Sequence, residues 1–378
     1  MPVVRRFRRV APLLVLALLL VGCETEGPRS TLHPVGYVAE QQLDLLIWTT
    51  WLSVGVVALV AGVLGYAIFR FRSRYTGDKD AIPNQVHGSV PLEITWTLIP
   101  VIIVILVAVP TVRTIFETEV RVQPQESDVL VHVTGYQWWW KFEYPELGIV
   151  TANELHVPVG TRVVLDLDSA DVLHSFWVPK LAGKRDMIPN QENQLWLIAD
   201  EEGIYWGHCA ELCLGAHAYM RFRVIVESEE EYQAWVESFQ EVQVQASQEE
   251  RQAIQPVQNN ELIQEGRTLF AQKGCIGCHS NANFGPGYGS PDFPNLTNFG
   301  LRNTVAAGVL ENTHENLTAW IRDPQAIKPG NYMPTLWQED DPDALEEASA
   351  IAAYLLSLGI EGEQQAQANA VGGTNGDR

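Results

Sequence analysis

The stretch Cys209-Ala-Glu-Leu-Cys213-Leu-Gly-Ala-His217-Ala-Tyr-Met220 decides what the rest of the chain must support. It places two thiols, an imidazole and a thioether within one short segment. Soft sulfur ligands combined with an imidazole favour copper, zinc or iron over a hard cation. The 378-residue chain has only five cysteines, too few for a disulfide scaffold at this length. We therefore treat this stretch as a candidate metal-binding loop.

The overall charge limits the possible partners of the chain. The formal net charge is −21 at pH 7, which argues against a nucleic-acid-binding protein. An acidic surface suits a basic protein partner or simple solubility. A length of 378 residues allows two or three domains.

Residues 1–23 have the anatomy of an export signal. Arginines precede a short apolar run, Val10–Val21, which is too short to span a membrane. The run leads into Leu20-Val21-Gly22-Cys23, which resembles a bacterial lipobox, so Cys23 is a candidate lipidation site. An ordinary signal peptide or an uncleaved anchor is the alternative.

Residues 24–119 contain two long apolar segments. Leu45–Phe69 and Ile94–Val112 carry no charged residue, and each has the length of about 20 residues that a spanning helix needs. We predict a transmembrane hairpin with spans at about 45–69 and 94–115. The connection is basic, which places it in the cytoplasm and both ends of the hairpin outside; its cations are Arg70, Arg72, Arg74 and Lys79.

Residues 120–227 change to a β pattern on the outer side of the membrane. Segments rich in β-branched residues alternate with Pro and Gly turns, as in Val129–Thr134, Arg162–Leu167 and Arg221–Val226. This pattern fits an all-β sandwich or barrel. The candidate metal loop lies just before the last of these segments.

An acidic connector, residues 228–260, follows the β region. Aromatic and apolar residues recur there at helical spacing, which predicts a short docked helix followed by a polar linker; they are Tyr232, Trp235, Val236 and Phe239. Residues 361–378 are poor in apolar side chains, and we predict a disordered tail.

Residues 261–360 carry a second metal motif. Cys275-x-x-Cys278-His279 is typical of covalent haem c attachment, with the histidine as an axial ligand of the iron. Met333 is the only later methionine, and a His/Met pair favours electron transfer. His314 or an open sixth position is the alternative. A thiol-redox or zinc pair would not need the adjacent histidine.

The stretch Cys209–Met220 is compatible with more than one kind of site. A single blue-copper ion would use one cysteine, two histidines and a weak methionine. Here a second cysteine is present, and His174 in Asp171-Val-Leu-His174-Ser-Phe-Trp-Val-Pro179 offers a second imidazole. Two thiolates and two histidines can hold two bridged copper ions. A disulfide between Cys209 and Cys213 is the alternative.

These motifs together resemble subunit II of cytochrome c oxidase, in the bacterial branch with a fused cytochrome c. The resemblance covers nearly the whole chain, and Gly135–Trp140 and Glu93–Pro100 also match. It implies a cupredoxin-like β-barrel and an all-α class I cytochrome c domain beside the hairpin. Gly266 and Phe270, with Tyr354 in the last helix, resemble the crossed terminal helices of that cytochrome fold.

The resemblance also implies residue roles. The ligands of a binuclear CuA centre would be His174, Cys209, Cys213, His217 and Met220 with the backbone carbonyl of Glu211, whose carboxylate would also bind Mg²⁺ shared with subunit I. Electrons would enter through Trp138, which we expect on a strand with Trp140 on the same face. Glu93 would lie at the mouth of a proton-uptake channel. His208 matches no ligand position, and we expect it to pack beside the site.

The function that follows is electron delivery to a respiratory oxidase in the bacterial cell membrane. Cytochrome c or an upstream respiratory complex would be the donor, and subunit I, with haem a and copper, would reduce oxygen to water and pump protons; subunit III is a further expected partner. The alternatives are the CuA subunit of a nitric oxide or nitrous oxide reductase, or a non-enzymatic copper-binding lipoprotein.

Overall fold

The computed structural model describes residues 26–71, 88–249, 261–284, 288–338 and 340–359. Residues 38–122 form one compact unit and the remainder of the chain forms the other, and each is described by itself. The predictions for Cys23 and the export signal, for most of the basic connection and for the tail lie outside the described residues.

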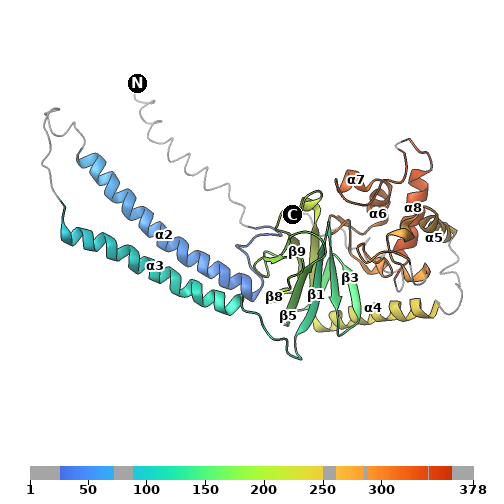
Figure 1. Cartoon of the computed structure of the whole chain (residues 1–378), viewed down its shortest axis with the longest axis horizontal. Helices are drawn as coiled ribbons and strands as arrows, with labels where there is room; N and C mark the ends of the chain where they lie inside the picture. The colour runs from blue at the N-terminus through green and yellow to red at the C-terminus, as the bar shows by residue number, and fades with distance from the viewer. Residues whose placement is uncertain (1–25, 72–87, 250–260, 285–287, 339, 360–378) are drawn as a thin grey trace, which may run out of the picture. The chain divides into compact units, whose positions relative to one another are not determined.

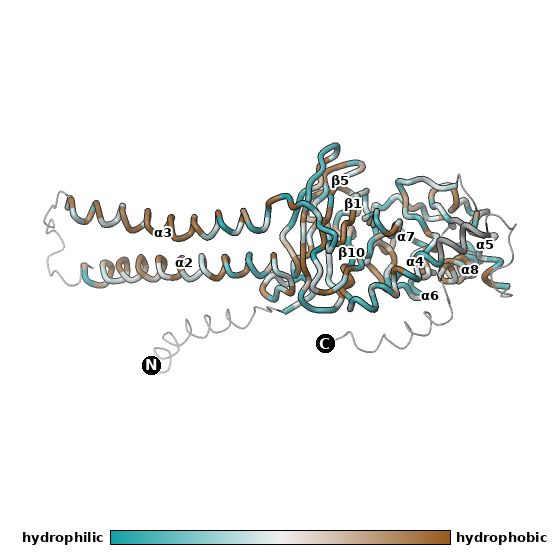
Figure 2. Tube along the Cα trace, turned by 90° about the horizontal axis from the view of Figure 1, so that it is seen from below, coloured by the Kyte–Doolittle hydropathy of each residue, from teal (hydrophilic) through white to brown (hydrophobic). Residues whose placement is uncertain are grey.

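The first unit is a pair of antiparallel helices, α2 (Tyr37–Arg70) and α3 (Val90–Thr118), which lie side by side (Figure 1). Both are long and apolar enough to cross a membrane, and their apolar residues run along most of their length (Figure 2). The Trp48 indole N–H donates to the Leu106 carbonyl at 3.1 Å. The helices extend beyond the two predicted spans at both ends, through flanking residues of mixed polarity that continue the helical turns.

The β region forms two five-stranded sheets. The first has the order β3-β2-β1-β5-β8, and its strands are β1 (Val129–Tyr136), β2 (Trp139–Tyr144), β3 (Ile149–Ala152), β5 (Arg162–Ser169) and β8 (Asn193–Ile198). The second has the order β4-β10-β9-β6-β7, and its strands are β4 (Glu154–Pro158), β6 (His174–Trp177), β7 (Arg185–Met187), β9 (Gly203–Cys209) and β10 (Arg221–Glu227). β1–β5 and β4–β10 are parallel, and the other pairs are antiparallel.

A cluster of aromatic rings joins the two sheets into a sandwich. Trp140 on β2 meets Phe176 on β6 and Phe222 on β10, with ring centroids 5.7 and 5.1 Å apart. All three side chains are fully buried. Alternating inward residues of this kind are what the β pattern of the sequence predicts.

The acidic helix α4 (Glu229–Glu249) packs on the sandwich through the predicted stripe of apolar residues. Trp235 stacks on the His156 ring, with centroids 4.3 Å apart and an interplanar angle of 9°. The acidic residues of the first turn face the positive end of the helix dipole.

The C-terminal region is mainly helical. It contains α5 (Glu261–Gln272), α6 (His314–Arg322), α7 (Pro324–Ile327) and α8 (Ala344–Leu356), with one short ladder of β11 (Thr304–Val305) and β12 (Leu310–Glu311). Helices α5 and α8 cross at Gly266, where an added Cβ would lie 1.9 Å from the Ala350 carbonyl oxygen. The rings of Phe270 and Tyr354 meet at 5.7 Å across the same crossing, as predicted.

We predict that replacing Trp235 with alanine loosens α4 from the sandwich. Removing a buried Trp side chain costs about 3–5 kcal/mol, and we expect the amide protection of residues 229–241 in hydrogen exchange to fall correspondingly. Gln233→Ala is the control, because Gln233 is exposed on the opposite face of the same helix. Equal protection in both variants would contradict the docking of α4 through Trp235.

Candidate metal centres

Each of the two thiols of the loop between β9 and β10 faces its own imidazole. Cys209 ends β9, and its Sγ lies 3.9 Å from Nδ1 of His174 on β6. Cys213 Sγ lies 3.4 Å from Nδ1 of His217. The two sulfur atoms are 3.9 Å apart, and both cysteines are free thiols. The structure therefore differs from the disulfide alternative and gathers soft ligands instead.

Two weaker donors complete the cluster. Met220 Sδ lies 3.8 Å from Cys213 Sγ, and the Glu211 carbonyl oxygen lies 3.1 Å from Cys209 Sγ. Glu211, whose carbonyl is one of these donors, is an exposed residue. The six residues that the sequence analysis named for this site thus lie together, with one imidazole and one weak donor near each sulfur.

Asp171 orients His174. Its Oδ1 accepts a hydrogen bond from His174 Nε2 at 2.8 Å, which leaves Nδ1 directed at the sulfur atoms. Burial alone would lower the pKa of His174, but the hydrogen bond to Asp171 and the nearby Cys209 raise it. An imidazole held by a carboxylate in this way is the usual arrangement of a metal-binding histidine.

Cys209 and Cys213 lie close enough to oppose each other's ionisation. Their interaction lowers the pKa of Cys209 and raises the pKa of Cys213. A cation with two charges would remove this conflict because both sulfurs could then be thiolates. The donor set and its electrostatics therefore fit a copper centre.

Trp138 lies beside this cluster, but in a different element from the one predicted. β1 ends at Tyr136 and β2 begins at Trp139, so Trp138 occupies the hairpin turn and not a strand. Side chains alternate between the two faces of a sheet only within a strand, and Trp138 lies outside both strands. The prediction that Trp138 shares a face with Trp140 was therefore wrong. The Trp138 indole N–H donates to the Cys213 carbonyl at 2.9 Å. Trp138 therefore touches the metal loop directly.

His208 packs beside the site, as expected. Its ring lies 5.0 Å from the Trp177 ring, and burial lowers its pKa to about 4. The imidazole is therefore neutral at neutral pH.

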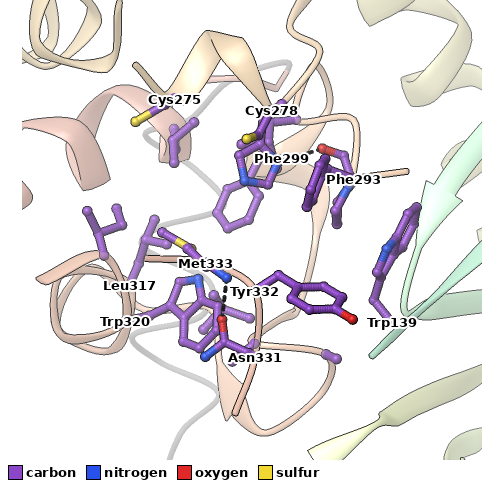
Figure 3. A pocket seen from close by; sticks show the side chains of 18 of the residues that line it. Trp139, Cys275, Cys278, Phe293, Phe299, Leu317, Trp320, Asn331, Tyr332 and Met333 are labelled. Atoms are coloured by element: carbon purple, nitrogen blue, oxygen red, sulfur yellow. Dashed lines mark hydrogen bonds between the residues drawn. The ribbon is translucent and has the colours of Figure 1, made fainter. Parts of the chain in front are cut away.

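The second centre is a cavity of about 250 Å³ in the C-terminal region. Cys275, Cys278 and His279 line one side, and Met333 lies across from the two cysteines (Figure 3). The His279 Nδ1–H donates to the Pro294 carbonyl at 2.9 Å, which leaves Nε2 for a metal. Burial lowers the pKa of His279, so the ring is neutral and able to ligate.

The remaining wall of this cavity is mostly apolar, as a haem requires. It is formed by side chains such as Phe270, Phe299, Leu317, Trp320 and Leu355. His314 is not among the lining residues; its Nε2 contacts the Ser349 carbonyl at 3.1 Å. Met333 is therefore better placed than His314 as the second axial ligand.

Residues of the β-sandwich close the cavity on another side. They include Gln137, Trp138 and Trp139, so the two candidate centres share a wall. Lys328 is also buried here, with 4% of its surface exposed. Sequence reasoning missed Lys328, because nothing in its sequence neighbourhood distinguishes it from a solvated lysine.

Three protein-family profiles match the chain. They are described as "Cytochrome C oxidase subunit II, transmembrane domain" at residues 36–114, "Cytochrome C oxidase subunit II, periplasmic domain" at residues 147–228 and "Cytochrome c" at residues 263–359. The "Cytochrome c oxidase subunit 2" of Alkalihalophilus pseudofirmus is 43% identical over 359 residues, which covers 93% of this chain and 97% of the relative.

The chain belongs to the cytochrome c oxidase subunit 2 family. The "Cytochrome c oxidase subunit 2" of Bacillus sp. PS3 is 38% identical over 92% of this chain and 96% of its own length. The "Quinol oxidase subunit 2" of Bacillus spizizenii is 36% identical, but over only 62% of this chain and 74% of its own length. The full-length matches therefore include the cytochrome c region.

Membership of the family confirms several predictions. The chain is a subunit of a membrane haem–copper oxidase with a cupredoxin-like domain on the outer face and a fused cytochrome c domain. Copper and haem c are the cofactors that the family implies, and the chain associates with other oxidase subunits.

Glu93, the residue predicted for proton uptake, is exposed and lies in the first turn of α3.

We predict that Asp171→Ala weakens copper retention. Loss of the group that holds a ligating histidine typically lowers metal affinity by about 10–100-fold, so the variant should lose copper to a chelator faster than the native chain does. Asp200→Ala is the control, because Asp200 is an exposed aspartate just before β9, at the end of that strand opposite to Cys209. Copper content is measured by elemental analysis, and equal retention in both variants would exclude this role of Asp171.

Proposed function

We propose that this chain receives electrons from cytochrome c or an upstream respiratory complex. It passes them through haem c and a binuclear CuA centre to subunit I, where oxygen is reduced to water with proton pumping. The observation that carries this proposal is the presence in one chain of two ligand sets, each suited to a one-electron carrier. Their shared wall supports transfer between them.

The copper centre is assigned to the six clustered residues. Cys209, Cys213, His174 and His217 would hold the two ions. Met220 and the Glu211 carbonyl would serve as weak ligands. Bound copper supplies reversible one-electron storage, and the buried, hydrogen-bonded loop limits movement of the ligands when the charge changes.

The haem is assigned to the cavity of the cytochrome domain. Cys275 and Cys278 would hold the haem covalently, and His279 and Met333 would ligate its iron. The Pro294 carbonyl fixes the ring of His279, and an apolar wall with a methionine ligand favours a high reduction potential. Bound haem supplies a second one-electron site.

Further partners are assigned by the same proposal. The exposed carboxylate of Glu211 is available for a Mg²⁺ shared with subunit I, and subunit III belongs to the complex.

Trp138 is the side chain through which electrons enter the copper loop, and its hydrogen bond to the Cys213 carbonyl supports this role. Cys23 is the lipid attachment site of the exported chain.

The alternative functions have less support. A copper-binding lipoprotein has no use for a covalently attached haem, and a nitric oxide or nitrous oxide reductase has no evident use for proton uptake at the hairpin. The relatives that match along nearly the whole chain carry the name cytochrome c oxidase subunit 2.

We expect the complex purified from membranes to contain about two copper ions per haem c, as the two bridging thiolates require. Its reduced-minus-oxidised spectrum should show haem c together with haem a from a co-purifying core subunit. Elemental analysis and absorption spectroscopy check this prediction. A single copper ion per haem c, or the absence of an oxidase core subunit, would overturn the proposal.

We also predict that Glu93→Ala slows oxygen reduction by the complex but leaves electron transfer from haem c to copper intact. A carboxylate at the cytoplasmic start of α3 would serve proton uptake and not electron transfer. Glu117→Ala is the control, because Glu117 lies exposed at the opposite end of the same helix. Oxygen consumption and single-turnover optical kinetics separate the two effects, and an unchanged turnover would exclude the role of Glu93.

A further inference from the structure

The loop that carries Met333 is hydrogen-bonded to the turn between β1 and β2 of the sandwich. Lys328 begins this loop after α7, and its Nζ donates to the Trp138 carbonyl at 2.6 Å. Burial lowers the pKa of Lys328 to about 7, and the amine can donate this hydrogen bond in either protonation state. A buried N–H group without an acceptor would be destabilising. The Trp138 carbonyl is therefore a structural requirement of the loop and not an incidental surface contact.

Tyr332, the residue before Met333, contacts the same turn in two ways. Its ring lies against the Trp138 ring, with centroids 4.8 Å apart and an interplanar angle of 36°. Its hydroxyl donates to Gln137 Oε1 at 2.8 Å. Figure 3 shows Tyr332 extending from this loop toward the sheet that carries Trp139.

Both contacts of Tyr332 lead to one atom of the metal loop. The Trp138 indole N–H donates to the Cys213 carbonyl at 2.9 Å. The Gln137 side-chain amide donates to the same carbonyl, also at 2.9 Å. Two short routes of ring contacts and hydrogen bonds therefore run from the residue beside Met333 to the backbone of Cys213.

We propose that Tyr332 is the electron bridge between the two centres and that Lys328 is the positioning residue that locks it in place. This rests on the proposed function of the two sites. In one transfer the haem iron goes from ferrous to ferric and the copper pair gains that one electron. No bond forms or breaks, and no proton moves, because Tyr332 keeps its hydroxyl hydrogen.

The contact with Tyr332 also shields Trp138 from other electron donors. Trp138 is only 7% exposed, since Tyr332 covers one side and the metal loop covers the other. At Gly215, an added Cβ would lie 2.2 Å from the Trp138 ring. A soluble donor therefore delivers its electron to the cytochrome domain and not to Trp138.

Independent contacts keep the cytochrome domain docked when this lock is removed. The Glu154 carboxylate of β4 accepts hydrogen bonds from the Asn303 N–H and the Thr304 hydroxyl, at 3.0 and 2.6 Å. The Arg223 guanidinium of β10 donates to the Gly308 carbonyl at 2.6 Å. Variants at Lys328 or Tyr332 therefore test the local contact without releasing the domain.

The first test is hydrogen exchange of the holo complex carrying Lys328→Met. We expect faster exchange at residues 330–333 and 137–138, because the Trp138 carbonyl loses its buried partner. Arg322→Met is the control, since it removes one positive charge from an exposed position at the end of α6. Unchanged hydrogen exchange in Lys328→Met would contradict the positioning role of Lys328.

The second test measures the internal electron transfer in the complex after photoreduction of haem c. We expect Tyr332→Leu to slow the reduction of copper by about tenfold, equivalent to ~1.4 kcal/mol in the barrier. Tyr332→Phe retains the ring and should lose less. Tyr288→Leu is the matched control, because Tyr288 is an exposed tyrosine of the same domain that does not line the cavity.

The outcomes separate this inference from the proposed function. An unchanged transfer rate in Tyr332→Leu, with native copper content and haem spectrum, overturns the bridge alone. Absence of copper or haem c from the native complex overturns the proposed function and the bridge with it. Hydrogen exchange needs no electron transfer, so it decides the lock in either case.

Discussion

The hydrogen bond from the Trp138 indole to the Cys213 carbonyl is the constraint on which the copper region depends. A buried N–H without an acceptor is costly, so the turn that carries Trp138 and the loop that carries Cys213 are positioned together. Gly215 makes this possible, because a side chain there would overlap the indole. The carbonyl that satisfies Trp138 thereby fixes the backbone that presents the Cys213 thiol.

The second half of the cluster depends on sheet pairing. His174 and Cys209 lie on neighbouring strands, β6 and β9, which are joined by the pair Phe176 and Cys209. Gly135 on β1 leaves room for the imidazole, since an added Cβ would lie 2.9 Å from the His174 ring. The aromatic core beneath keeps both sheets in register, so His174 and Cys209, which are 35 residues apart in the sequence, lie next to each other.

The sequence predicted the elements, and it named residues that the structure brings together, because both depend largely on short-range patterns. The strand at Arg221–Glu227, the docked stripe of α4 and the spacing of Cys209, Cys213 and His217 are local features. His174 could be offered from the sequence as a second imidazole, but its distance along the chain gave no sign that it meets Cys209, which only the resemblance implied. Trp138 was misplaced because an apolar run does not reveal where a hairpin turns. Lys328 and Glu154 were missed because a buried charge in a specific long-range contact has the same local sequence as a solvated one.

Fusion of the cytochrome domain changes what its interface has to achieve. A tethered domain has a high effective concentration, so modest contacts are enough to keep it docked. The interface can therefore use buried polar groups, which stabilise less than apolar packing but permit few alternative arrangements. Glu154 illustrates this, because its buried carboxylate is matched by two specific donors and by His156. Lys328 does the same at the other end, where a shift of the loop would leave its amine buried without an acceptor. The tether thus supplies much of the association, and the buried polar groups select the one orientation that sets Tyr332 against Trp138.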